Sequence, residues 1–301
     1  MENEILESWK KAGKIAAEAR EYGKTLIKPE SNFLEVSRKI EEFIVKKGAK
    51  PGFPVQLSIN GIAAHYTAFP EDNSVFSEGN LVKLDLGAHI NGYIGDTALT
   101  LEVSTNKNQE LIKASKEALD AAIKLAKPGT KVCEIGEAVD NVITKYGFHP
   151  IKNLSGHKID QYILHSNLSI PNYNNKDKTE LEEDMIIAIE PFASTGMGLI
   201  KEGKASSNYR LYEFKPVRDS ITKEILLFIK KEFSTLPFAK RYLVPKFPLA
   251  KVNYALSNLE KLGIIYQYPQ LPEKEENCLV SQHEHTIYIK DKPIILTKVD
   301  D

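Results

Sequence analysis

The feature that most constrains this chain is a predicted β-hairpin with an aspartate on each arm. Residues 81–90 and 93–101 both have the composition of strands, and only Asn91 and Gly92 separate them. Both central positions of a type I′ turn need a positive φ, which asparagine and glycine tolerate. The dipeptide therefore predicts a tight two-residue turn, and such a turn fixes which residues of the two arms face each other.

If the arms pair from the turn outward, Gly87 opposes Asp96 and Asp85 opposes Ala98. The two carboxylates then lie on one face as diagonal neighbours, with Cβ atoms roughly 7 Å apart. Buried carboxylates without partners repel each other and take up protons, whereas a divalent cation keeps both charged. We interpret the pair as metal ligands. The alternative is that one aspartate faces solvent near the turn and the other caps a neighbouring element.

Further candidate ligands lie in segments that resemble strands or glycine turns. His157 follows Ser155-Gly156, an apolar run at 185–189 ends in Glu190, and residues 282–289 alternate as a single strand.

The alternation at 282–289 separates Glu284 from its two histidine neighbours. With a period of two, Glu284 shares a face with Thr286 and Tyr288, while His283 and His285 point to the other face. We therefore expect Glu284 to be the ligand and the two histidines to point away from the metal.

Four carboxylates and one imidazole form a hard, oxygen-rich ligand set. It suits a pair of Mn, Fe, Co or Zn ions bridged by carboxylate, whereas a structural zinc site prefers thiolates. The chain has only two cysteines, Cys133 and Cys278, so a thiolate cage is excluded. Two isolated cysteines without a secretory leader also predict a reducing, cytoplasmic location.

Several local strings resemble the type II branch of the methionine aminopeptidases, metallopeptidases with the pita-bread fold, and the match runs along nearly the whole chain. The strings are NGIAAHYT at 60–67, LDLGAH at 84–89, GDTA at 95–98, SGHKI at 155–159, AIEPF at 188–192 and HEHTI at 283–287. By this resemblance we expect the short archaeal form of the branch, in which no polar extension precedes the core. The resemblance implies an α+β fold, with a curved, mostly antiparallel sheet covered by two pairs of helices.

The resemblance also implies a role for each ligand candidate. Asp85 would chelate one divalent ion, Asp96 and Glu284 would bridge two ions, and His157 with Glu190 would hold the second.

Catalytic and substrate-binding residues follow from the same resemblance. Glu190 is similar to the glutamate that shuttles a proton between the attacking water and the departing amine. His165 resembles the histidine that binds the substrate carbonyl, and His65 the one that contacts the scissile amide. The residues that align with the substrate pocket are Phe53, His65, Leu164, His165, Asn208 and Tyr268. Three departures from relatives, Gln56, Asn208 and His283, leave fine specificity and inhibitor response open.

The assignment of both His157 and His165 to one site depends on the resemblance alone. His157 and His165 are eight residues apart, which on a straight strand is roughly 26 Å. A turn between them is required if both are to reach one site.

The rest of the chain fits this organisation. Helical patterns cover about 2–26, 30–47, 107–126 and 132–146, and residues 220–231, 251–263 and 264–268 read as helix, helix and strand, an order typical of a winged helix. We expect a catalytic domain at 1–195 plus 271–301, and an insertion subdomain at 196–270 that walls the substrate pocket.

Charge and hydropathy exclude two classes of partner. A formal net charge of −1 over 301 residues gives no reason to expect DNA binding. No apolar run reaches the length of a membrane span. The lysines of the insertion are interpreted as a solvated face.

The expected function is therefore a monomeric methionyl aminopeptidase with two divalent ions (Co, Mn, Fe or Zn). It would act on N-terminal methionine peptides of new proteins that have a small second residue, and docking on the ribosome stays open. One alternative is an aminopeptidase P or prolidase that cleaves at proline, although such enzymes usually carry a large N-terminal domain and lack this insertion. The other is a non-catalytic ribosome- or RNA-binding protein of the same fold, although those characteristically lose metal ligands.

Overall fold

The predicted hairpin lies in the middle of the largest β-sheet of the computed structural model, which describes residues 1–299. Strands β3 (Leu81–Ile90) and β4 (Tyr93–Glu102) pair antiparallel with Gly87 opposite Asp96, which confirms the predicted register. Asn91 and Gly92 have φ values of 52° and 85°, as a type I′ turn requires. The turn sequence thus places both aspartates on one face of the sheet.

Within residues 1–299 this sheet has eight strands, all paired antiparallel, in the order β1-β3-β4-β15-β8-β6-β7, with β16 added beside β15. The remaining bounds in this sheet are β1 Lys50–Ile59, β6 Ser155–Lys158, β7 Ser169–Pro171, β8 Ile186–Ile189, β15 Glu284–Tyr288 and β16 Ile294–Ile295. The order places β15, which is late in the sequence, directly between β4 and β8. Segments far apart in the chain therefore meet at the centre of the sheet.

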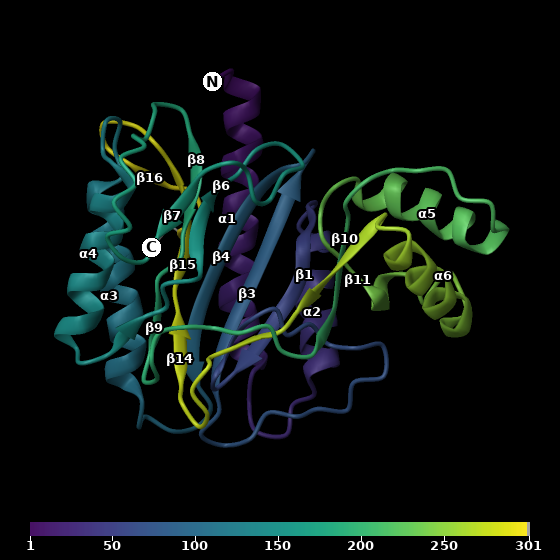
Figure 1. Cartoon of the computed structure of the whole chain (residues 1–301), viewed down its shortest axis with the longest axis horizontal. Coiled ribbons are helices and arrows are strands. Elements are labelled where there is room, and N and C mark those ends of the chain that lie inside the picture. The colour runs from purple at the N-terminus through teal and green to yellow at the C-terminus, as the bar shows by residue number, and fades with distance from the viewer. Residues whose placement is uncertain (300–301) are drawn as a thin grey trace.

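Helices cover the two parts of this sheet through separate hydrophobic clusters. Helices α1 (Asn3–Leu26) and α2 (Phe33–Lys46) pack with β1 and β3, while α3 (Gln109–Leu125) and α4 (Val132–Lys145) pack with β7, β8 and β15. In Figure 1, α3 and α4 stand side by side at the left of the sheet. The arrangement is the predicted α+β class.

Smaller strand groups join the loops around the sheet. Strand β9 (Phe192–Ser194) pairs with β14 (Val280–Gln282) and β5 (His149–Pro150), and β2 (Ile62–Ala64) pairs with β13 (Leu271–Pro272). These pairings join segments that are far apart in the chain.

The segment between β9 and β13 forms a unit with its own core. A sheet of β10 (Ala205–Leu211), β11 (Phe238–Ala239) and β12 (Ile265–Pro269) packs with α5 (Ser220–Phe233), η1 (Lys240–Tyr242) and α6 (Leu249–Lys261). Both helices and the following strand lie where the sequence predicts them, whereas β10 and β11 were not predicted. This unit lies at the right of Figure 1. We propose the boundaries 196–270 for it, with 1–195 plus 271–301 as the catalytic domain.

One predicted strand is broken. Residues 282–289 do not form a single strand, because β14 ends at Gln282 and β15 begins at Glu284. Strand β14 pairs with β9, whereas β15 pairs with β4 and β8. The chain therefore changes sheet partners at His283, a long-range effect that alternation of residue types does not reveal. No helix within residues 1–299 is long and apolar enough to cross a bilayer.

Candidate metal centre and active site

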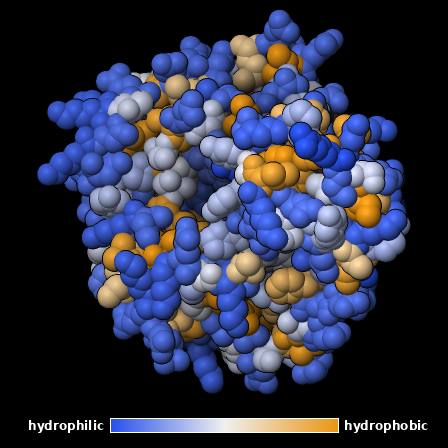
Figure 2. Space-filling model, turned by 45° about the vertical axis from the view of Figure 1, so that its right-hand side comes forward, coloured by the Kyte–Doolittle hydropathy of each residue, from blue (hydrophilic) through white to orange (hydrophobic). Residues whose placement is uncertain are grey.

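A cavity of about 240 Å³ lies where the central sheet meets the insertion. The face of the molecule in Figure 2 is deeply hollowed near its centre, and both hydrophobic and hydrophilic residues border the hollow. All the predicted ligand, catalytic and pocket residues line the cavity: Phe53, His65, Asp85, Asp96, His157, Leu164, His165, Glu190, Asn208, Tyr268 and Glu284. The fold therefore gathers the whole predicted set at one place.

Three of the four carboxylates come from neighbouring strands. Asp85 is on β3, Asp96 is on β4, and Glu284 begins β15, where it pairs with Ala98 of β4. All three residues are at least nine-tenths buried. The antiparallel register, rather than loop conformation, sets their spacing, so the site is built on rigid elements.

His157 joins the carboxylates from the other side of β15. Its Nε2 atom lies 3.7 Å from Asp96 Oδ2 and 3.5 Å from Glu190 Oε1. Ligand atoms of Asp96, His157 and Glu284 all lie within 4.8 Å of one another. A cation among these atoms would be reached by oxygen and nitrogen donors from three strands.

The hydrogen bonding of the carboxylates fits a cation site. Among the described residues, Asp85 Oδ1 and Asp96 Oδ1 are buried and have no hydrogen-bond partner. No lysine or arginine is found among the described residues that line the cavity. Buried acceptors of this kind are costly unless a cation or donor satisfies them. The residues present therefore fit divalent metal ions.

The electrostatics of the cluster support the same interpretation. Burial raises the pKa of Asp85 to about 7. Burial also raises the pKa of Asp96, and the nearby charge of Asp85 raises it further. Burial also raises the pKa values of Glu190 and Glu284, and the charge of Asp96 raises both further. Positive charge placed here would reverse these shifts, because it favours the ionised carboxylates.

His65 is held in a strained conformation at the edge of the cavity. Its φ is 71°, in the left-handed region that side chains rarely adopt. Gln56 Oε1 accepts a hydrogen bond from its N–H (2.7 Å), and Ser206 Oγ donates to its carbonyl (2.6 Å). Strain that is held by several bonds clusters at functional sites. No local sequence pattern predicts this conformation.

The ring of His65 has a defined tautomer. Its Nδ1 lies 3.0 Å from the carbonyl oxygen of Pro269. A carbonyl can only accept, so Nδ1 carries the hydrogen and Nε2 of the neutral ring remains an acceptor. Burial lowers the pKa of His65 to about 4, which keeps the ring neutral at physiological pH.

The chain turns between His157 and His165, as it must if both residues are to reach one site. The chain reverses through an isolated bridge between Asp160 and Ile163. As a result, the rings of His157 and His165 have centroids 4.3 Å apart. Burial lowers the pKa of His165 well below 6.5, and the neighbouring His157 lowers it further.

The two histidines beside Glu284 point elsewhere, as predicted. His283 Nδ1 bonds Ser115 Oγ at 2.8 Å, and His285 Nδ1 bonds Thr297 Oγ1 at 2.9 Å. Neither belongs to the described residues that line the cavity.

Further residues line the cavity that the sequence did not indicate as site residues. They are Gln56, Ala64, Asn153, Leu154, Ser155, Phe192 and Pro237. Pro237 is the clearest case, because it belongs to the insertion and reaches the cavity only through tertiary packing.

Comparison with known proteins identifies the family. The model for metallopeptidase family M24 matches residues 7–225. A methionine aminopeptidase from Pyrococcus abyssi is 46% identical over 287 residues, which cover 95% of this chain and 97% of that protein.

Solved structures show the same fold. A thermophilic Arx1 superposes with a TM-score of 0.87 at 17% identity, covering 100% of this chain and 92% of the other. A methionine aminopeptidase from Thermotoga maritima gives a TM-score of 0.71 at 24% identity, covering 99% of this chain and 98% of the other. At these identities the likeness supports the α+β pita-bread fold. Together with the near-full-length sequence match, it shows that this chain belongs to metallopeptidase family M24, in its methionine aminopeptidase branch.

Proposed function

We propose that this chain is a methionyl aminopeptidase that removes the initiator methionine from new proteins by two-metal hydrolysis. One observation carries the proposal: four carboxylates and an imidazole line one cavity, and two of the carboxylates have a buried oxygen without a partner among the described residues. The 46% identity to an archaeal methionine aminopeptidase supports this activity.

The ligand roles are part of the proposal. Asp85 would hold one ion, Asp96 and Glu284 would bridge both, and His157 with Glu190 would hold the second. Bound there, two divalent ions would polarise the scissile carbonyl and lower the pKa of a water for attack near neutral pH. The ligand set accepts Co, Mn, Fe or Zn, among which availability often selects.

Glu190 is the proposed general base and acid. Its carboxylate faces the cavity beside His157. It would take the proton from the attacking water and pass it to the departing amine, a role worth about 10² to 10⁴ in rate.

Two neutral histidines would bind the peptide bond. His65 presents Nε2 as an acceptor, which suits an N–H group of the substrate at the scissile amide. His165 is also neutral and can donate one ring N–H to the substrate carbonyl, where negative charge develops in the transition state.

The pocket for the methionine side chain would be formed by Phe53, Leu164, Asn208 and Tyr268. Phe53, Leu164 and Tyr268 supply apolar surface, which suits an unbranched thioether. The small volume of the cavity leaves little room for a bulky second residue, so Gly, Ala, Ser, Thr or Val should be preferred there.

A cytoplasmic location and a monomeric state complete the proposal. Both cysteines of the described chain are free and buried, which is typical of reducing compartments. Transient docking on the ribosome would bring the enzyme to its substrates as they emerge.

The test is hydrolysis of a Met-Ala-Ser peptide by protein stripped with chelator and then resupplied with Co²⁺ or Mn²⁺, with an Ala-Pro peptide alongside. Metal-dependent release of free methionine alone, detected by mass spectrometry, is the expected result. Cleavage of only the proline peptide would indicate a prolidase-like enzyme. No cleavage despite bound metal would indicate a binding protein of this fold.

A further inference from the structure

The strands that carry the proposed bridging ligands are joined by threonine side chains as well as by backbone pairing. Thr97 Oγ1 on β4 donates to the carbonyl of Glu284 at 2.9 Å. Thr286 Oγ1 on β15 accepts from the N–H of Asp96 at 2.7 Å and donates to its carbonyl at 2.8 Å. Each bridging carboxylate therefore has its own backbone held by a hydroxyl from the opposite strand.

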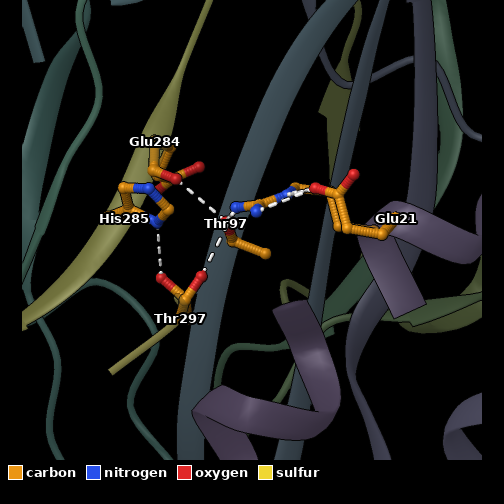
Figure 3. A network of polar contacts seen from close by, with 6 residues as sticks. Glu21, Thr97, Glu284, His285 and Thr297 are labelled. Atoms are coloured by element: carbon orange, nitrogen blue, oxygen red, sulfur yellow. Dashed lines mark hydrogen bonds and ion pairs between the residues drawn. The ribbon is translucent and has the colours of Figure 1, made fainter. Parts of the chain in front are cut away.

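Arg20 of α1 extends this contact away from the cavity. The guanidinium is 8% exposed, and its Nη1 donates to Thr97 Oγ1 at 2.5 Å. Because Thr97 in turn donates to Glu284, the bonds run from guanidinium to hydroxyl to carbonyl (Figure 3). Such chains polarise one another, so each bond strengthens the next. Glu21 accepts from Arg20 Nη2 at 3.0 Å and fixes the other side of the guanidinium.

Thr297, in the segment after β16, contacts both β15 and Arg20. Its Oγ1 accepts from the N–H of Thr286 at 3.0 Å and bonds His285 Nδ1 at 2.9 Å. Its carbonyl oxygen lies 3.5 Å from Arg20 Nη1. Thr97, Thr286 and Thr297 are fully buried, so water cannot replace these bonds.

Two glycines let α1 come close to the sheet. Arg20 can therefore reach the seam between β4 and β15, the line along which these two strands pair. A Cβ added to Gly95 of β4 would lie 2.4 Å from the Cα of Gly13 in α1, and one added to Gly13 would lie 2.3 Å from the carbonyl oxygen of Leu296. No side chain fits in that space. The helix is therefore seated against β4 and the segment after β16 at a fixed distance.

We propose that Arg20 and Thr97 are positioning residues for the metal centre, which set the separation of Asp96 and Glu284 from the far side of the sheet. The inference rests on the proposed function only for the assignment of these two residues as bridging ligands. Groups that orient ligands without touching the metal typically change metal affinity about 10- to 100-fold when removed. The productive geometry tolerates a shift of only about 0.5 Å.

The experiment compares Thr97→Val with Thr97→Ser. Valine keeps the shape and removes the hydroxyl, whereas serine keeps the hydroxyl. Chelator-stripped proteins are titrated with Mn²⁺ by calorimetry, and the spin coupling of the two ions is followed by electron paramagnetic resonance. We expect Thr97→Val to bind the second Mn²⁺ at least about tenfold more weakly with an altered coupling, and Thr97→Ser to match the wild type.

Thr130→Val is the matched control, because its buried hydroxyl also donates to a backbone carbonyl, that of Leu125, and neither residue is among those that line the cavity. It should lower thermal stability without changing Mn²⁺ binding. Thr97→Val with wild-type Mn²⁺ affinity and coupling would overturn the inference, as would equal losses in the valine and serine variants.

Arg20→Lys provides a second route if Thr97→Val does not fold. Lysine keeps the charge but loses the planar fork that contacts Thr97 and Glu21 together. Weaker binding of the second Mn²⁺ with an altered coupling supports the proposal, and unchanged binding contradicts it. Because the readout is metal binding in the absence of peptide, it holds or fails independently of whether the enzyme releases methionine.

Discussion

The rings of His157 and His165 lie with centroids 4.3 Å apart, although eight residues separate them in the sequence. The chain turns back on itself between them, so one ring reaches the carboxylate cluster and the other lies beside it. His157 is buried, and both rings have lowered pKa values. The two imidazoles are adjacent, yet the proposal gives them different tasks.

Substitution of each histidine separates these tasks. His165→Ala should lower kcat about 10²- to 10³-fold, because it removes a donor to the developing oxyanion, while metal content stays at the wild-type level. His157→Ala should lose bound metal as well as activity. Metal stoichiometry by mass spectrometry, measured beside kcat on a Met-Ala-Ser peptide, distinguishes the two. Loss of metal in His165→Ala would contradict the assignment.

Metal affinity should increase with pH between 6 and 8. Burial raises the pKa of Asp85 to about 7, so this carboxyl is protonated below that pH in the metal-free protein and must lose its proton to bind a cation. His157, with a pKa lowered to about 4, is already neutral over this range and adds no dependence. One such proton predicts an increase in apparent affinity of at least about tenfold.

The raised pKa values of Asp96, Glu190 and Glu284 also make metal affinity increase with pH. Calorimetry in buffers of different ionisation enthalpy counts the protons released on Mn²⁺ binding. In stability terms, a carboxyl whose pKa is raised on folding stabilises the metal-free protein at low pH and loses that contribution as pH rises through the folded value. Stabilisation by metal should therefore be larger at pH 8 than at pH 6. An affinity independent of pH would be inconsistent with protonated carboxyls.

The backbone strain at His65 predicts an unusual order of stability. Because φ is 71°, glycine fits this position better than alanine does. We expect His65→Gly to be more stable than His65→Ala by about 1 kcal/mol, although both lose activity. Urea denaturation of the two variants tests this order, and equal stability would argue against stored strain.

An ion pair between Arg241 and Glu41 ties the insertion to α2. Both side chains are at least nine-tenths buried, and Glu41 also accepts from Val55 N–H and Tyr242 OH. Arg241→Met should destabilise the protein by about 3–5 kcal/mol, because it leaves a buried carboxylate without its counter-charge. Urea denaturation measures this loss.

Lys39→Met is the control for that prediction, because it breaks an exposed pair with Glu35 on the same helix α2. Water screens the charges of such an exposed pair, so this variant should lose little stability. Similar losses in the two variants would show that the Arg241 pair does not anchor the insertion.

Much of the fold could be read from local sequence. Asn91-Gly92 sets a two-residue turn, and the turn sets the register that brings Asp85 and Asp96 to one face. The helices follow from apolar periodicity, and Asn32 caps α2 by accepting from the N–H of Glu35. The five ligand candidates were found because their residue types and local strings resemble a family, not because spacing alone requires them to meet.

Other features depend on contacts that no local pattern records. The break at His283 arises because β14 and β15 pair with different strands, and the φ of His65 is held by Gln56 and Ser206. Pro237 reaches the cavity from the insertion, and Arg20 reaches the seam between β4 and β15 from α1.

The sequence by itself determined the strand and helix periods, the hairpin register and the identity of the ligand-type residues, because turn geometry and side-chain alternation act over a few positions. Only the tertiary structure decided how β15 comes to lie between β4 and β8, how the insertion closes the cavity, and which buried polar groups hold the proposed ligands in place. Those outcomes depend on pairing and burial between residues that are far apart in the chain, and such contacts form only when the whole sheet assembles.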